Sequence, residues 1–196
     1  MEIKKLKISS IFILVKPELL MKQQIAILRG INVSGQKKIL MADLKNILEE
    51  EGFKTVQTYI QSGNVLFYSD EQNLADKINL AIKKHYDFDV PVQVLGVDEL
   101  EKVILENPFL KEENVEEKTL HVTFLATEPA EELVKSVEGL VLENEFFRII
   151  GQVVYLYCPN GYGKIKMNNT FIERKLKVSA TTRNWKTVNK LVELAD

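Results

Sequence analysis

Residues 24–29 of this 196-residue chain read QIAILR, and this short stretch decides the fold. In an extended chain Ile25 and Ile27 point to one side, and Ala26 and Leu28 point to the other. A strand that is apolar on both faces belongs in the middle of a sheet that is covered on both sides. The sequence therefore predicts a central strand here, with a layer of protein on each face of its sheet.

A helix and a hairpin follow this strand. Apolar residues at helical spacing over 41–48 predict a helix, which Gly52 ends. Residues 55–60 and 65–68 have the character of strands, and the four residues between them read QSGN. Because Gly63 and Asn64 tolerate positive φ, these four residues predict a tight hairpin turn.

A second helix and a fourth strand complete the first half of the chain. Ser69 and Gln72 are spaced as a capping box, ahead of a helix whose apolar face continues to Tyr86. Residues 90–97 then predict a strand. The order βαββαβ over residues 21–97 is that of the ferredoxin-like plan, a split βαβ unit.

Residues 98–196 predict a second, plait-like half. Strands are expected at 119–125, 146–150 and 152–157, and helices are expected from about Asp98, Pro129 and Ile165. A last helix from about Asn184 to Leu194 takes the place where a final strand would be expected. The fold class is therefore α+β. No segment between the halves is long or polar enough for a flexible linker, so we expect them to pack as one unit.

Residues 1–20 differ in character from the rest. The apolar run over 8–15 is far shorter than the roughly 20 residues that a membrane span needs. Lysines precede the run, but Lys16, Pro17 and Glu18 follow it without a small-residue cleavage site. We interpret 1–20 as an N-terminal extension, of the kind that a misassigned start codon would add. The alternative is an added edge strand or helix. Either way we expect a cytoplasmic protein with no membrane partner.

Charge is unevenly distributed along a chain whose net charge is only −2. From Asp98 to Glu145 there are 14 acidic and 4 basic residues, whereas from Lys164 to Lys190 there are 8 basic residues and 1 acid. The two regions either face solvent or each other, or the basic one faces an anionic ligand. The single cysteine, Cys158, excludes an internal disulfide and alternates with apolar residues, which favours a buried structural thiol.

The loop after the first strand carries the first group of candidate ligand-binding residues. Arg29, Asn32, Gly35 and Lys38 lie between the predicted strand and the predicted helix. A helix start leaves backbone N–H groups unpaired and carries the positive end of the helix dipole, so cations and amides beside it favour a bound anion. The alternative is a structural loop in which Arg29 pairs with an acid of the second half.

The second group of candidates lies near the end of the chain, where residues 181–188 read TTRNWKTV. Thr182 or Asn184 can cap the last helix, and Trp185 belongs to its buried stripe. Arg183 is then expected on the first helical turn, where a cation is unfavourable. It requires a buried acid, a terminal carboxylate or a bound anion. We expect Arg183 and Asn184 to share one anion-binding cleft with the first group.

Four motifs give this chain a resemblance to a known family. LRGINVSG at 28–35, MADL at 41–44, YIQSGNV at 59–65 and TRNWKTV at 182–188 occur in that order. The chain from about Met21 to its end resembles the bacterial family called domain of unknown function 1697. That family usually carries Gly-Gly where this chain has Ser34-Gly35. If the backbone at Ser34 needs positive φ, serine is strained there and glycine would not be.

Taken together, these patterns indicate a conserved protein that binds an anionic ligand, either a nucleotide, a phosphorylated metabolite or a nucleic-acid backbone. The alternatives are an enzyme acting on a phosphorylated or carboxylated small molecule, and a scaffold whose motifs only join the halves. No cofactor is implied, and the two histidines lack the spacing of metal ligands. The first strand lacks the aromatic residues with which the RNA-recognition version of this plait stacks bases, so nucleic acid is the weaker partner.

The apolar first strand generates a prediction about cooperativity. If both of its faces are covered because the two halves pack together, denaturant should unfold the protein in a single transition. Fluorescence of Trp185 reports on the second half, and circular dichroism reports on the whole chain. The two curves should coincide, and two separated midpoints would contradict packing as one unit.

Overall fold

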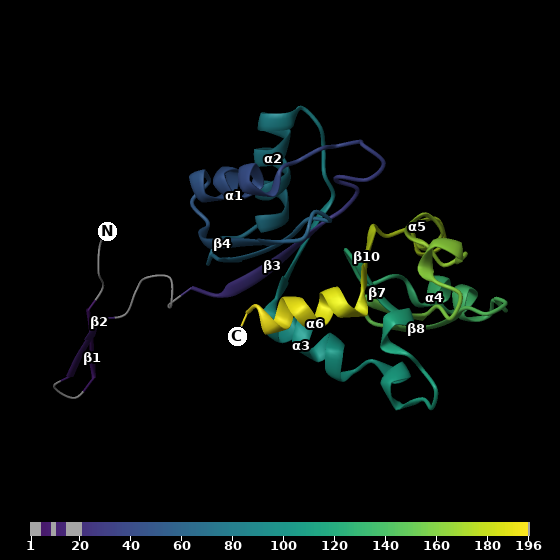
Figure 1. Ribbon diagram of the computed structural model, residues 1–196. Coiled ribbons are helices and arrows are strands. Elements are labelled where there is room, and N and C mark those ends of the chain that lie inside the picture. Colours follow the sequence, from purple (N-terminus) through teal and green to yellow (C-terminus); the bar gives the residue numbers. More distant parts are fainter. Residues whose placement is uncertain (1–4, 9–10, 15–20, 196) are drawn as a thin grey trace. The chain divides into compact units, whose positions relative to one another are not determined.

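The computed structural model of this protein describes residues 5–8, 11–14 and 21–195. The chain divides into two compact units, which meet in the sequence between Val97 and Asp98 (Figure 1). Each unit contains one four-stranded antiparallel sheet with helices packed on it. The fold is α+β, as the sequence predicts.

The first unit has the ferredoxin-like topology. Its elements follow the order β3 (Gln23–Leu28), α1 (Met41–Glu50), β4 (Lys54–Tyr59), β5 (Asn64–Tyr68), α2 (Leu74–Tyr86) and β6 (Val92–Gly96). The strands are arranged β4-β5-β3-β6, so β3 is central and pairs antiparallel with β5 and β6. Figure 1 shows α1 and α2 on the same face of this sheet.

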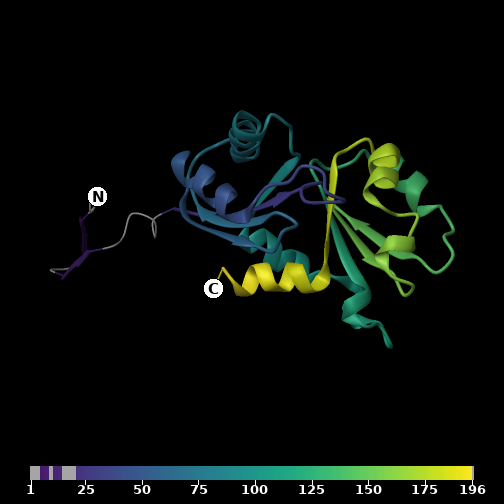
Figure 2. The ribbon, with the colours of Figure 1, turned by 45° about the horizontal axis from the view of Figure 1, so that its top comes forward.

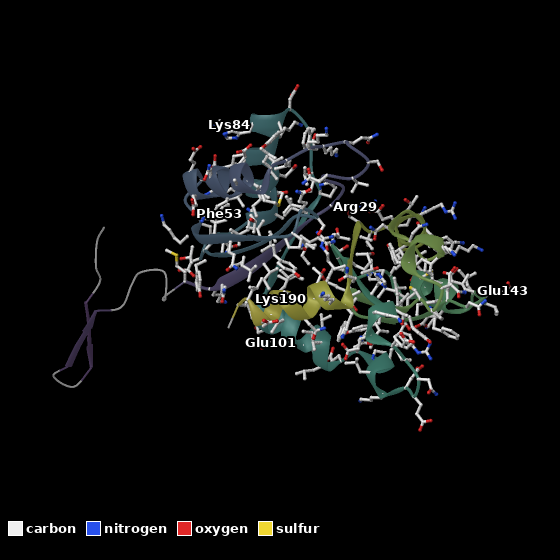
Figure 3. The ribbon with its side chains drawn as sticks, viewed as in Figure 1. Arg29, Phe53, Lys84, Glu101, Glu143 and Lys190 are labelled. Carbon is white, nitrogen blue, oxygen red and sulfur yellow. The ribbon has the colours of Figure 1, made fainter. Side chains whose placement is uncertain are left out.

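The core of the first unit lies between the sheet and its two helices. Ala26 and Leu28 of β3 face this core together with residues of α1, α2 and β5. Phe53, labelled in Figure 3, packs its ring 4.8 Å from that of Phe67. Ile25 and Ile27, on the opposite face of β3, are both 0% exposed. Both faces of the central strand are therefore buried, which is the environment that its sequence predicts.

The second unit repeats the same topology. Its elements are α3 (Val97–Leu105), β7 (Leu120–Leu125), α4 (Glu131–Glu138), β8 (Phe146–Ile150), β9 (Val153–Tyr157), α5 (Asn169–Leu176), β10 (Ala180–Asn184) and α6 (Trp185–Glu193). The strand order is β10-β7-β9-β8. If the strands of each unit are numbered one to four along the chain, the first sheet has the order 2-3-1-4 and the second has 4-1-3-2. The two orders are the same, read from opposite edges of the sheet.

The two faces of the second sheet carry different helices. Helices α4 and α5 pack on the face that presents Val154 and Leu156, where the core also includes Phe171 and Met167. On the other face, Tyr155 is buried and its hydroxyl donates a hydrogen bond of 3.1 Å to the carbonyl of Val103 in α3. Helix α6 packs against β7 and β10.

The strand β10 corrects the sequence analysis, which expects no strand before the last helix. Residues 180–184 pair antiparallel with β7 in continuous register, from Ala180 opposite Leu125 to Asn184 opposite His121. Figure 2 shows that the chain passes directly from this strand into α6. The threonines at 181 and 182 are β-branched and favour a strand, but the helix-capping signal at Asn184 obscures so short an element.

A smaller correction concerns the start of α2. The predicted capping box of Ser69 and Gln72 does not form, because the helix begins only at Leu74 and is preceded by Asn73 in a left-handed conformation. The hydroxyl of Ser69 instead accepts a hydrogen bond from the N–H of Glu71. The side chain of Ser69 thus stabilises the turn between β5 and α2.

Within the N-terminal extension the structure describes two short strands. β1 (Lys5–Ile8) and β2 (Ile11–Leu14) pair with each other in a separate two-stranded sheet. In the part of the chain that the structure describes, neither strand joins the four-stranded sheet of the first unit, whose edges are β4 and β6. The rest of the extension, at 1–4, 9–10 and 15–20, lies outside the described residues.

The β4–β5 turn provides a stability prediction. Gly63 has φ +81°, and a Cβ atom there would lie 2.7 Å from Ile31 Cδ1 and 2.8 Å from Leu28 Cβ. Gly63→Ala should therefore lower the free energy of unfolding by about 2–4 kcal/mol, through overpacking added to backbone strain.

Gly35→Ala is the matched control for that substitution. Its φ is +77°, but a Cβ atom there would meet nothing within 4 Å. It should show only the strain of the left-handed backbone, about 1–2 kcal/mol. Urea unfolding measures both variants. Equal losses would mean that the close approach to Leu28 and Ile31 contributes nothing.

Candidate functional site

The loop between β3 and α1 has an unusual backbone. Gly30, Asn32, Ser34, Gly35 and Lys37 all have positive φ, between 44° and 77°. A tight turn lies inside the loop, where the N–H of Gln36 donates to the carbonyl of Val33 over 2.9 Å. Ser34 has φ 49°, so the strain expected for a serine at this position is present.

Asn32 ties this loop to the β4–β5 turn. Its side-chain nitrogen donates to the carbonyls of Ile39 and Gln61, each over 2.9 Å, and its oxygen accepts from the N–H of Ile39 over 2.9 Å. Both amide hydrogens are thus used within the protein. The left-handed conformation that Asn32 adopts is one that asparagine tolerates. Its visible role is to position the loop, and only a lone pair of its oxygen remains for a ligand.

A cavity of about 470 Å³ opens beside this loop. Three of the predicted ligand-binding residues line it, namely Asn32, Gly35 and Lys38. Lys38 is exposed, and its ammonium group forms no ion pair within the described part of the chain. The cavity is therefore lined by a lysine that no carboxylate of the described residues neutralises by direct contact.

The start of α1 forms another wall of the cavity. Leu40 and Met41 line it, and Leu40 is the N-cap residue, whose side chain makes no capping hydrogen bond. The first N–H groups of a helix have no partner within it, and here the N-cap side chain does not supply one. The positive end of the helix dipole therefore faces the same cavity as Lys38.

Three cavity residues were not predicted as part of a site. Gln61 comes from the β4–β5 turn, Asp43 from the first turn of α1, and Tyr86 from the end of α2. The Tyr86 hydroxyl donates to Asp43 Oδ2 over 3.2 Å. Burial and the neighbouring Asp43 raise the pKa of Tyr86, so its phenol is protonated at neutral pH. Asp43 and Gln61 lie in the motifs at 41–44 and 59–65, which could have pointed to them, whereas Tyr86 lies in none of the four motifs.

The two other cations of this loop are placed differently. Lys37 donates from Nζ to the carbonyl of Asp89 over 2.6 Å and lies 5.8 Å from the centre of the Phe88 ring. Arg29, labelled in Figure 3, comes directly after β3, and its N–H donates to the carbonyl of Pro91 over 2.9 Å. Neither residue is among those that line the cavity.

Arg183 and Asn184 belong to the second unit. Arg183 lies on β10 and not on the first turn of a helix, so the expected clash with a helix dipole does not arise. Arg183 is 8% exposed, and its guanidinium donates to the carbonyl of Thr182 over 2.9 Å. Burial lowers the pKa of Arg183 to about 10, so the side chain remains charged at neutral pH. Asn184 is the N-cap of α6, accepting from the N–H of Thr187. A cleft shared by Arg29 and Arg183 stays a prediction.

Other reactive side chains do not form a second centre. Cys158 is buried, as predicted, and burial raises the pKa of its thiol to about 12 with a further contribution from Glu145. His121 stacks on Tyr162 at 4.8 Å, and burial lowers its pKa. Over the described ranges, no three His, Cys, Asp or Glu residues are grouped as metal ligands. No helix among those residues is long and apolar enough to cross a membrane.

Comparison with known proteins places the chain in a family. The family model described as "Protein of unknown function (DUF1697)" matches residues 21–155, and the chain belongs to that family. The match begins at the expected Met21 and ends before the fourth motif at 182–188. No curated protein matches.

Among solved structures, the conserved bacterial protein SP0830 from Streptococcus pneumoniae is similar, with a TM-score of 0.65 and 24% sequence identity. The likeness covers 90% of this chain and 99% of that one. At this identity it shows the fold alone.

The loop backbone supports a prediction with two substitutions to the same residue. Ser34→Gly removes the strain of a left-handed serine, and the Ser34 side chain makes no described contact that would be lost. The relief of strain should exceed the cost of a more flexible unfolded chain, so the free energy of unfolding should rise by about 0.5–1 kcal/mol. Asn32→Gly needs no change of backbone conformation but removes three hydrogen bonds. It should lower that free energy by about 2–3 kcal/mol.

Chemical denaturation of the two variants beside the unmodified protein measures both changes. Changes of the same sign in the two variants would show that backbone strain at Ser34 or the bridging role of Asn32 has been misjudged.

Proposed function

We propose that this protein binds a small anionic ligand, a nucleotide or a phosphorylated metabolite, in the cavity between the β3–α1 loop and the start of α1. One observation carries the proposal. Lys38 has no ion pair among the described residues, and it lines a cavity that also contains the uncapped start of a helix. A phosphate there would accept hydrogen bonds from the first-turn N–H groups and would neutralise Lys38.

The carboxylate that lines the cavity favours a ligand with more than a phosphate. Asp43 carries a negative charge, and the Tyr86 phenol already donates a hydrogen bond to it. A second anionic group close to Asp43 would be repelled, whereas hydroxyl or amino groups would donate hydrogen bonds to its free oxygen. The cavity therefore suits a molecule that is anionic at one end and rich in hydrogen-bond donors at the other.

Binding is supported better than catalysis. An enzyme site typically holds a titratable group whose pKa lies near the working pH. The one cavity group with a shifted pKa is Tyr86, and its shift leads away from neutrality. The phenol is therefore a fixed hydrogen-bond donor and a poor acid or base. The enzyme remains the second candidate.

The scaffold alternative has partial support. Asn32, from the motif at 28–35, holds the carbonyl of Gln61, from the motif at 59–65. These two motifs thus stabilise each other within one unit, and mutual support explains Asn32 without a ligand. It does not explain Lys38, which is exposed and makes no such contact with the described residues.

We also propose a cytoplasmic location, because the lysines and the apolar run at 8–15 lack the pattern of a secretory signal peptide.

Thermal-shift measurements test the proposal with nucleotides, sugar phosphates and inorganic phosphate as probes. A ligand at 100 times its Kd adds about 2.7 kcal/mol to stability, which corresponds to a rise of about 5–10 °C in Tm for a chain of this size. Lys38→Ala should abolish the shift while leaving the Tm of the free protein within a few degrees, because Lys38 is exposed and unpaired.

Lys45→Ala is the matched control, since Lys45 lies on α1, close in sequence to Lys38, but pairs with Glu49 at 3.8 Å. It should retain the full shift. The proposal fails if none of the probes stabilises the protein, or if both variants respond alike.

A further inference from the structure

Five cations surround α5 in the second unit, namely Lys164, Lys166, Arg174, Lys175 and Lys177. We call this group the α5 basic surface. It makes up most of the basic segment at 164–190. The surface runs from the turn before the helix to the residue after it. Two of the cations precede α5, two lie in its last turn and one follows it, so the charges flank a helix about 12 Å long.

These five cations have no acidic partner in the described part of the chain. None forms an ion pair or a side-chain hydrogen bond there. Lys102, Lys118, Lys135 and Lys190 of the same unit each pair with a glutamate close in sequence, whereas Lys111 and Lys186 form no ion pair among the described residues. Unpaired cations are therefore most numerous around α5.

Three of the charges converge on one aromatic ring. The ammonium of Lys166, the guanidinium of Arg174 and the ammonium of Lys175 lie 5.9, 5.5 and 6.0 Å from the centre of the Phe171 ring. Phe171 is only 7% exposed and belongs to the hydrophobic core of the second unit. Like charges held so close repel one another, and a bound polyanion would relieve that repulsion.

The nearest carboxylates are already engaged by backbone groups. Glu173 accepts hydrogen bonds from the N–H of Ala180 and the hydroxyl of Ser179. Glu145 accepts from the N–H groups of Lys166 and Met167. These acids stabilise the turns on either side of α5.

We propose that the α5 basic surface binds the phosphate backbone of a nucleic-acid duplex without reading its sequence. A duplex carries about one charge per 1.7 Å of its axis, so several of its phosphates can contact cations that flank a helix about 12 Å long. This site is separate from the cavity at Lys38 and does not depend on a ligand there.

The surface lacks the groups that would read bases. Phe171 is buried and offers no stacking platform. The Asn168 side chain accepts from the N–H of Phe171, and Asn169 Oδ1 accepts from the hydroxyl of Thr182, so both amides have structural tasks. Contacts limited to phosphates position a protein on nucleic acid but carry no sequence information.

A duplex fits this surface better than a membrane does. Binding to a bilayer surface through a basic helix also needs exposed apolar side chains to enter the interface. The exposed large hydrophobic residues of the described chain all lie outside 164–177. The neighbouring α4 carries Glu131, Glu132 and Glu138, which would repel phosphates and so limit the surface on that side.

Fluorescence anisotropy of two labelled 20-base-pair DNA duplexes of unrelated sequence tests the proposal on the full chain. Both duplexes should bind with equal affinity at 50 mM salt. Between 50 and 200 mM salt, log K should fall against log salt with a slope of about −3 to −4, as expected for roughly four phosphate contacts.

Two triple variants with the same change of charge localise the binding. Lys166→Gln, Arg174→Gln and Lys175→Gln together should weaken binding at least tenfold at 50 mM salt and should make the salt slope shallower by about 2–3. Lys102→Gln, Lys118→Gln and Lys135→Gln together should change the affinity less than twofold. Circular dichroism confirms folding. If the first variant does not fold, the exposed Arg174→Gln alone should weaken binding severalfold.

Lys38→Ala should leave duplex binding unchanged, which separates this proposal from that of the small-ligand cavity. The proposal is overturned if neither duplex binds at 50 mM salt, if the two triple variants lose affinity equally, or if one duplex sequence is strongly preferred. It is also overturned if vesicles containing phosphatidylserine bind the protein and the duplexes do not.

Discussion

The first unit depends on one close approach, that of the end of β3 to the β4–β5 turn. The N–H of Leu28 donates to the carbonyl of Gly63 over 2.8 Å, and no Cβ atom would fit at Gly63 against Leu28 and Ile31. Asn32 then binds Gln61 of the same turn. These contacts fix the path of the β3–α1 loop. That path places Lys38 beside the start of α1, so the geometry of the cavity follows from the packing of one turn.

The sequence predicts most of the fold because most of its elements carry their own signals. The strand at β3 is apolar on both faces, α1 and α2 have helical spacing, and glycine marks the turn between β4 and β5. The strand β10 has no comparable signal. It is short, it contains an arginine, and it ends on the asparagine that caps the next helix. Its existence depends on pairing with β7, more than fifty residues earlier in the chain, and local patterns do not report such a pairing.

The sequence predicts only part of the candidate site, again because local patterns do not report contacts between distant residues. Asn32, Gly35 and Lys38 lie in one loop, so their proximity could be inferred from sequence. Asp43 and Tyr86 are 43 positions apart, and the hydrogen bond between them exists only because α1 and α2 pack side by side. The role of Asn32 could be seen only in the structure, because any asparagine in a loop can either contact a ligand or satisfy backbone groups. Here the backbone groups account for both of its amide hydrogens.

The two units show that the proposed sites belong to local sequence and not to the shared topology. Both have the βαββαβ plan and the same strand order. In the first unit, twelve residues connect the first strand to the first helix, and they form a wall of the cavity. In the second, only residues 126–130 make that connection. The second helices also differ. Lys77 and Lys83 of α2 pair with Glu71 and Asp89, whereas the cations around α5 have no such partners in the described chain. One fold can thus carry a cavity in one copy and a charged surface in the other, because function depends on the residues placed upon it.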